Sequence, residues 1–255
     1  MATTKKAPVA KTTAVAVVKK TSGAVVNIQD MLRKQAESMS ERTSPASGIS
    51  IRVTQDKQFS LPDGQKTDEL EVVIVDFVAR NEFYEGAYDK DNMSPPACFA
   101  IGVAPNKLVA SDNSPQKQAD TCAECPMNAF GSAGKGKACK NGRVLAVLPV
   151  DADENTPIWL LKVSPTALKG FDGYVQGVAR TFQTPPVGVV TKVSFDPNVT
   201  YASLRFSDAT PNENLAAHFA RQAEAKELLE QEPDVSGYEA PKPVKAMARK
   251  APVRR

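Results

Sequence analysis

LEVVIVDFVA, residues 70–79, is the stretch that decides the fold, because its β-branched and apolar side chains are typical of a β-strand. It is the longest of nine such segments, and the other eight are residues 51–54, 58–61, 98–103, 107–110, 143–150, 158–163, 187–195 and 201–206. Nine short strands with few helices predict a mainly β (α+β) protein whose strands form a barrel or a sandwich.

Two helices are predicted beside these strands, the first inside a β-rich core that spans residues 51–210. It begins at Ser164 and Pro165, an N-cap followed by proline at the first helical position, and its apolar stripe is expected to cover one end of the sheet. The second is expected at residues 211–231, because the preceding TPNE sequence forms a capping box with proline in place. A short helix is also predicted within residues 25–50, which end in a linker rich in Ser, Pro and Gly.

The positive charge of the chain is concentrated at its two ends. The net charge is only +3, from 32 basic and 29 acidic residues. Residues 1–24 contain five lysines, residues 241–255 contain six basic residues, and neither segment contains an acid. We therefore predict a disordered basic arm at 1–24 and a disordered tail at 232–255, both attracted to a polyanion. The alternative is that these ends only keep the chain in solution.

No targeting or membrane segment is recognisable in the sequence. The apolar run near the start, residues 14–18, is flanked by lysines and is too short for a signal peptide or a membrane span. We therefore expect a protein that has no membrane contact and stays in the cytoplasm.

Four cysteines, all that the chain contains, are the strongest chemical signal in the sequence. Their pattern is Cys98-x23-Cys122-x2-Cys125-x13-Cys139. The Cys-x-x-Cys pair places two thiolates on one tight turn, and the two distant cysteines complete a tetrahedron around a metal. We therefore predict a metal-binding insertion at residues 98–143, called the cysteine insertion below.

Zinc is the metal we expect, because four thiolates suit it and a closed four-ligand site supports a structural role. Such a site has no position for a reactive water, so metal-based hydrolysis is not expected. Since Cys125-Pro126 matches the end of iron–sulfur ligand runs, an iron–sulfur cluster is the alternative. A disulfide, a redox-active dithiol and four unrelated core thiols are further alternatives. A reducing cytoplasm disfavours the disulfide, and the lack of a βαβ unit disfavours the dithiol.

A basic segment overlaps the last cysteine and points to a phosphate ligand. Four cations lie within nine residues without an acid: Lys135, Lys137, Lys140 and Arg143. In a loop pinned by a metal they are candidates to grip phosphates, and the alternative is that they offset the negative charge of a zinc–tetrathiolate group. Phe130 in the same loop and Tyr84 after the 70–79 strand are candidates to stack on bases, with core packing as the alternative.

No catalytic signature accompanies these features. The sole histidine, His218, has no partners for a triad and is expected to have a surface or packing role. The glycines before Lys137 lack the spacing of a P-loop. We therefore expect a protein that is not an enzyme.

A resemblance adds to this interpretation. Residues 96–148, with Cys-x-x-Cys-Pro-x-Asn-x-Phe-Gly-Ser followed by Gly-Lys-Ala-Cys, resemble small cysteine-bearing proteins of tailed bacteriophages. The layout of residues 159–206 is similar to phage single-stranded DNA-binding proteins built on an OB-fold, and helix-destabilising members of that type carry a zinc subdomain inserted in the barrel. The resemblance implies an OB-like barrel with a zinc-binding insertion and the four cysteines as ligands. Such proteins usually end in an acidic tail that recruits partners, whereas this chain ends in basic residues.

The function we expect is that of a single-stranded DNA-binding protein in phage DNA replication or recombination, which coats exposed strands in the host bacterial cytoplasm. Replication or recombination proteins are the expected protein partners. Two alternatives are a zinc-stabilised protein-binding adaptor or regulator, and an iron–sulfur subunit of a nucleic-acid enzyme. RNA instead of DNA is a further alternative for the ligand.

Overall fold

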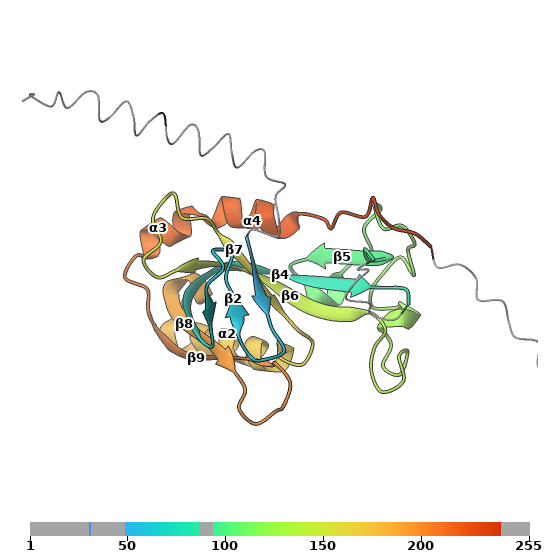
Figure 1. The fold of residues 1–255 in the computed structure, drawn as a ribbon, viewed down its shortest axis with the longest axis horizontal. Helices are drawn as coiled ribbons and strands as arrows, with labels where there is room; N and C mark the ends of the chain where they lie inside the picture. The colour runs from blue at the N-terminus through green and yellow to red at the C-terminus, as the bar shows by residue number, and fades with distance from the viewer. Residues whose placement is uncertain (1–30, 32–48, 87–93, 241–255) are drawn as a thin grey trace, which may run out of the picture. The chain divides into compact units, whose positions relative to one another are not determined.

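The structure of the protein, a computed structural model, describes residue 31 and residues 49–86 and 94–240. In these residues the chain is mainly β with a few helices, as predicted (Figure 1). The strands are β1 (Ser50–Val53), β2 (Phe59–Ser60), β3 (Lys66–Thr67), β4 (Leu70–Phe83), β5 (Cys98–Gly102), β6 (Lys140–Pro149), β7 (Trp159–Val163), β8 (Val189–Phe195) and β9 (Leu204–Pro211). The helices are α2 (Leu168–Phe182), α3 (Leu215–Ala220) and α4 (Gln222–Glu230).

All nine strands belong to one mixed sheet in the order β3-β2-β1-β7-β6-β4-β8-β9, with β5 paired to β4 outside this path. Only the β1–β7 pair is parallel among the described strands. The order ends at β3 and β9, which do not pair with each other, so backbone hydrogen bonds between the described strands do not close a barrel. A curled mixed sheet, mostly antiparallel, with a few helices packed against it therefore matches the predicted α+β class at the level of layers.

The 14-residue strand β4 organises the sheet. One edge pairs with β6 from Val72 to Glu82. The other edge is shared, because β8 pairs with Leu70–Val72 and β5 pairs with Ala79–Phe83. One long strand therefore connects the centre of the sheet to the cysteine insertion.

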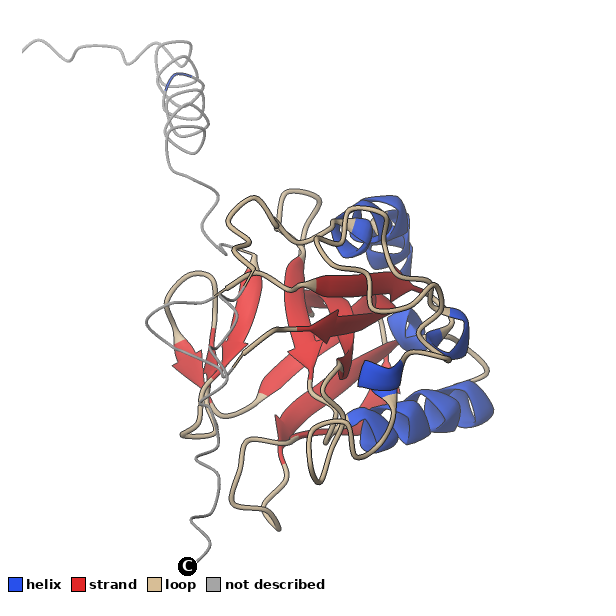
Figure 2. Cartoon of the chain, turned by 90° about the vertical axis from the view of Figure 1, so that its right-hand side faces the viewer, coloured by secondary structure: helices blue, strands red, loops and turns tan. Residues whose placement is uncertain are grey.

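The two faces of β4 are both buried, which explains its nearly continuous apolar sequence. On one face Phe171 of α2 contacts Phe77 and Phe206 edge-on, with ring centroids 5.1 and 5.0 Å apart. On the other face Val75 and Val78 pack in the cluster that includes the apolar side of α4. A bulge between Ile74 and Asp76 shifts the alternation by one residue, so that both halves of the strand keep apolar side chains in each layer. Figure 2 shows the helices to the right of the strands in that view.

Most predicted strands are present, with shifted ends, and one is replaced. Residues 107–110 form no strand, because a 3-10 turn at Pro105–Lys107 bends the chain and Val109 makes a single bridge to Thr121. Strand β3 was not predicted, since two residues are too few to show a period.

Both helices begin later than their capping signals indicate. Ser164 lies in a turn, where its carbonyl accepts from the Ala167 amide at 3.0 Å, and α2 begins at Leu168. The expected helix at 211–231 begins only at Leu215, because Pro211 still belongs to β9 and pairs with Val189. It is also interrupted at Arg221, which separates α3 from α4. Its predicted capping box is therefore the end of a strand.

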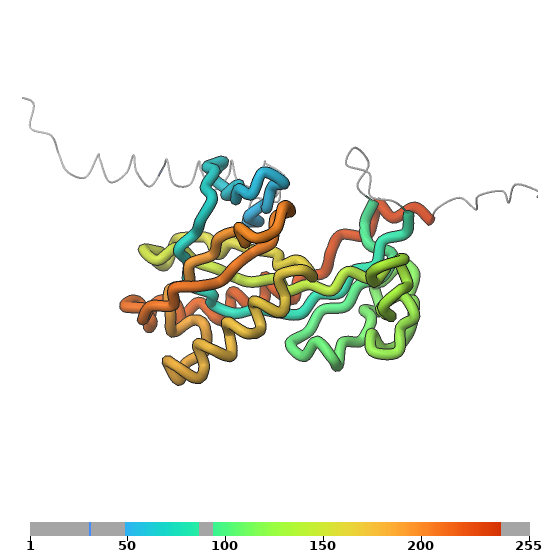
Figure 3. The backbone as a smooth tube through the Cα atoms, turned by 90° about the horizontal axis from the view of Figure 1, so that it is seen from below, coloured from blue at the N-terminus to red at the C-terminus, as the bar shows by residue number. Residues whose placement is uncertain are grey.

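The chain beyond α4 lies against the cysteine insertion, where the sequence predicted a disordered tail from residue 232. Ser111 Oγ donates to Glu232 at 2.5 Å, and Asn113 Nδ2 donates to the same carboxylate at 2.5 Å. Farther along, Tyr238 donates to Glu85 at 2.5 Å. Figure 3 shows this segment running beside the insertion. We call residues 231–240 the C-terminal strap.

Several predictions fall outside the described residues. They are the basic arm at 1–24, most of the helix and linker at 25–50, and residues 241–255 of the tail. Within the part of the chain that is described, no helix has the length and apolar character needed to cross a membrane.

Candidate metal centre and adjacent basic loop

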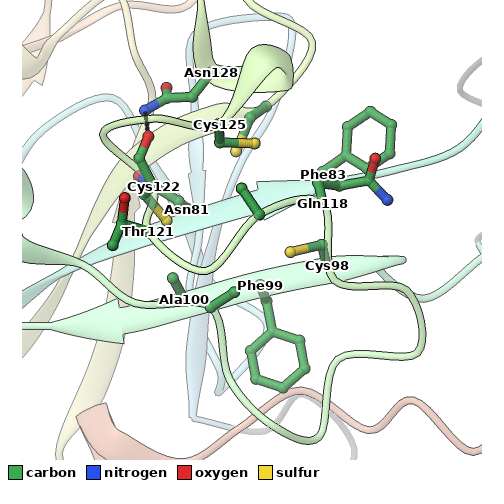
Figure 4. Close-up of a pocket in the computed structure, with 13 residues that line it drawn as sticks. Asn81, Phe83, Cys98, Phe99, Ala100, Gln118, Thr121, Cys122, Cys125 and Asn128 are labelled. Carbon is green, nitrogen blue, oxygen red and sulfur yellow. Dashed lines mark hydrogen bonds between the residues drawn. The ribbon is translucent and has the colours of Figure 1, made fainter.

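The four predicted metal ligands meet at one pocket beside the end of β4. Cys98 is the first residue of β5 and Cys139 directly precedes β6, while Cys122 and Cys125 lie on the loop between these strands. All four line the pocket, and none forms a disulfide. Figure 4 shows three of them around it. The structure therefore brings together cysteines that are 41 positions apart in the chain at their extremes.

Local hydrogen bonds hold the loop that carries the middle cysteines. The Cys122 amide donates to the Leu108 carbonyl at 2.9 Å, and the Cys139 amide donates to the Met127 carbonyl at 2.9 Å. Pro126 begins a 3-10 turn that places Asn128 N 3.0 Å from the Cys125 carbonyl. Farther on, Gly131 adopts φ +94°, a left-handed conformation that only glycine adopts freely. The Cys-x-x-Cys segment is therefore a tight turn, as its spacing predicted.

The electrostatics of the pocket favour the neutral thiols of Cys122 and Cys139 when nothing is bound. Burial raises the pKa of Cys122, and burial together with the neighbouring thiols raises the pKa of Cys139 to about 12. Lys137 opposes part of that rise in the pKa of Cys139. Deprotonation of this pocket at neutral pH needs a bound cation, because four thiolates in one place repel one another.

The pocket has the donors for a soft metal but not a finished ligand set. In the described parts of the chain, no three His, Cys, Asp or Glu side chains stand in an arrangement that would hold a metal ion. Four sulfur donors are the chemistry preferred by zinc and by iron–sulfur clusters. The residues fit these groups by type and line one pocket, and the presence and identity of any metal stay a prediction.

Two asparagines that the sequence did not single out line the same pocket. Asn128 Nδ2 donates to the Cys122 carbonyl at 2.6 Å, and its Oδ1 accepts from Lys137 at 3.1 Å. Asn81 lies within β4 and is 4% exposed. The sequence offered no signal for Asn81, because it lies beyond the predicted strand at residues 70–79 and joins β4 only in the structure.

Three of the four predicted phosphate-binding cations are exposed. Lys135, Lys137 and Lys140 form no ion pair with an acid within the described residues. Lys137 contacts Asn128, and Lys140 Nζ donates to the Lys137 carbonyl at 3.3 Å. The basic loop, defined here as residues 130–140, therefore presents three positive charges to solvent.

Arg143 is placed differently from its prediction as a phosphate contact. It lies in β6, its side chain is only 9% exposed, and its guanidinium is 3.4 Å from the carboxylate of Asp172 on α2. A side chain buried between a strand and a helix is not accessible to a phosphate. Its position in a strand, where alternate side chains face inward, accounts for the difference.

The two candidate rings also differ. Phe130 is 80% exposed on the basic loop and belongs to none of the core clusters of the described residues. Tyr84 is half-exposed, and its hydroxyl donates to the buried Glu82 at 3.0 Å. Burial and this neighbouring carboxylate raise the pKa of Tyr84. Phe130 is therefore free to stack on a base, while Tyr84 is tethered at its polar end.

His218 has a packing role, which is one of the two roles, surface or packing, that the sequence predicted. It is buried, and its Nδ1 is 3.0 Å from the Asn212 side chain. Burial lowers its pKa, so the imidazole is neutral near pH 7.

Comparisons with known proteins do not extend this description. No family model, curated protein or solved structure matches the chain.

Proposed function

We propose that the protein binds single-stranded nucleic acid, with single-stranded DNA as the ligand, and that it does so without catalysing a reaction. The observation that carries this proposal is the composition of the basic loop. An 80% exposed phenylalanine shares this short loop with three exposed lysines that no acid neutralises within the described residues. Rings that stack on bases and cations that follow phosphates are the two components of sequence-tolerant single-strand binding.

Zinc bound by Cys98, Cys122, Cys125 and Cys139 would support this loop. When bound, a tetrathiolate metal supplies a structural crosslink between the start of β5, the intervening turn and the start of β6. An iron–sulfur cluster is the alternative occupant, and a brown colour with absorption near ~400 nm distinguishes it from colourless zinc.

An OB-like fold is part of the same proposal. The open sheet with its helices is compatible with an OB-like scaffold that carries the cysteine insertion, as in the phage single-stranded DNA-binding proteins that the sequence resembles. By that resemblance the protein would coat exposed strands during phage replication or recombination in the host cytoplasm. The basic ends at 1–24 and 241–255 would add affinity through contacts to phosphates, and these contacts need no fixed geometry.

A protein-binding adaptor is the second candidate, and one observation favours it. Val103 and Val109, both in the cysteine insertion, are 80% and 60% exposed. Apolar side chains exposed near each other in the chain are common where a protein partner binds.

A binding titration tests the proposal directly. The full chain is titrated with fluorescent single- and double-stranded oligonucleotides of equal length at two salt concentrations. We expect tighter binding to the single strand and a loss of affinity as salt rises, because phosphate contacts release counterions. Equal and weak binding to both forms would contradict the proposal and favour the adaptor.

A further inference from the structure

A buried amide faces the cysteine pocket without a partner of its own. Asn81 lies in the second half of β4, between Ala100 of β5 and Asn141 of β6 in the sheet register. Its side chain lines the pocket together with the four cysteines and is 4% exposed. Figure 4 shows it next to Cys122. An asparagine so placed needs partners for both ends of its amide.

One end of this amide is satisfied and the other is not. Asn141 Nδ2 donates to Asn81 Oδ1 at 2.8 Å, which assigns the oxygen to the β6 side. Asn81 Nδ2 then has no hydrogen-bond partner in the structure, although it is shielded from water. A buried donor left in this state is costly, so its presence indicates a group that completes it.

A group of suitable chemistry beside Asn81 is the sulfur of Cys122, since both side chains line the same pocket and lie next to each other in Figure 4. An amide donor stabilises a thiolate more than a neutral thiol. A metal-bound thiolate is a stronger acceptor than a thiol, so binding of a metal would complete the unpaired donor.

We propose that Asn81 is a positioning residue of the metal site, which donates its Nδ2–H to the sulfur of Cys122 when that sulfur is a metal-bound thiolate. This inference rests on the metal site proposed above and assigns one of its supporting contacts. Such contacts around the ligands orient them and tune the metal, and their removal typically lowers metal affinity about 10- to 100-fold.

Asn128 provides the matched control for this role. It is also an asparagine, lines the same pocket and contacts Cys122. Its amide, however, donates to the backbone carbonyl of Cys122 at 2.6 Å and not to the sulfur. A change at Asn128 therefore disturbs the loop without removing a donor from a thiolate.

Cobalt(II) titration of the full chain separates the two residues. In Asn81→Leu we expect cobalt affinity about 10- to 100-fold lower and a sulfur-to-cobalt charge-transfer band at lower energy, because a thiolate that loses a donor holds its electrons less tightly. In Asn128→Ala we expect reduced affinity with the band in its original position. An Asn81→Leu protein with the parent's affinity and the parent's band would overturn the inference. Parent protein that binds no cobalt would overturn the metal site itself.

A measurement on the unaltered chain covers the case in which Asn81→Leu does not fold. The protein is labelled with nitrogen-15 and loaded with cadmium-113, which takes the place of zinc at thiolate sites. A hydrogen bond from nitrogen to a metal-bound sulfur transmits a scalar coupling from the metal to the donated proton. We expect coupling between cadmium and one side-chain amide proton of Asn81, with none at Asn128. Cadmium that is bound without coupling to Asn81 would refute the role of this residue and leave the metal site intact.

Discussion

Removal of Lys135 and Lys140 together is the sharpest test of nucleic-acid binding by the basic loop. Both side chains are exposed and neither pairs with an acid within the described residues. Lys137 is left in place, because it contacts Asn128 and opposes part of the rise in the pKa of Cys139. The double change Lys135→Ala and Lys140→Ala therefore removes two charges from the loop and spares the lysine that supports the cysteines.

The expected magnitude follows from the number of charges. Each phosphate contact on a single strand contributes about −0.7 to the slope of log K against log salt concentration. Two lost contacts make this slope shallower by about 1.4. For a fourfold rise in salt, the parent protein then loses about seven times more affinity than the double variant.

Fluorescence anisotropy with a single-stranded oligonucleotide at four or more salt concentrations measures this slope. The matched control is the double change Lys66→Ala and Lys169→Ala, which removes the same charge from β3 and α2, where both lysines are exposed. We expect the control to keep the parent's slope within a few tenths. If both double variants shift the slope equally, only net charge matters and the basic loop is not a binding surface.

Four further changes have distinct expected outcomes. Phe130→Ala should weaken single-strand binding by about 1–3 kcal/mol in the same titration, at an unchanged salt slope, and Phe130→Tyr should not. Arg143→Met should lower the free energy of unfolding by about 1 kcal/mol in a urea titration without changing the salt slope, because its partner Asp172 is half-exposed. With chelator present, thermal stability should fall as pH rises from about 8.5 towards 12, because burial raises the pKa of Cys139 and folding disfavours ionisation of this thiol. Metal-loaded protein should instead lose stability as pH falls, because protons compete with the metal for the thiolates. Glu232→Gln should speed amide hydrogen exchange in the C-terminal strap. In the parent protein, the hydrogen bonds from Ser111 and Asn113 lower the pKa of Glu232, so the stabilisation of the strap by this carboxylate should be lost as pH falls below about 4.

The strands were predictable because their signal is local. Residues of β4 are buried on both faces, and burial of that kind requires the apolar run seen in the sequence. The extension of β4 to Phe83 was not predictable in the same way, because Arg80, Asn81 and Glu82 interrupt that run. Pairing with β5 and β6 overrides their weak strand propensity.

The meeting of the four cysteines in one pocket was predictable, and the surroundings of that pocket were not. Four cysteines in a chain without others have few uses, so their spacing alone placed them together. Arg143 shows the limit of counting charges, because the sequence does not reveal that this residue faces α2 and not the solvent. Asn81 shows a second limit, since its proximity to Cys122 depends on the sheet register between β4, β5 and β6.

The position of the cysteines beside β4 would determine how much of the proposed metal site exists before a metal binds. Cys98 pairs with Phe83 of β4, and Lys140, the residue after Cys139, pairs with Glu82. Two of the four sulfurs are therefore attached to strands that the hydrophobic core already holds in register. Cys122 and Cys125 lie on a loop, whose order depends on turns and on a few hydrogen bonds. A metal would need to order only this turn, and the conformational entropy lost on binding would be correspondingly small. The basic loop follows the same turn, so the ordering of the proposed metal site and the presentation of Phe130 would be one event.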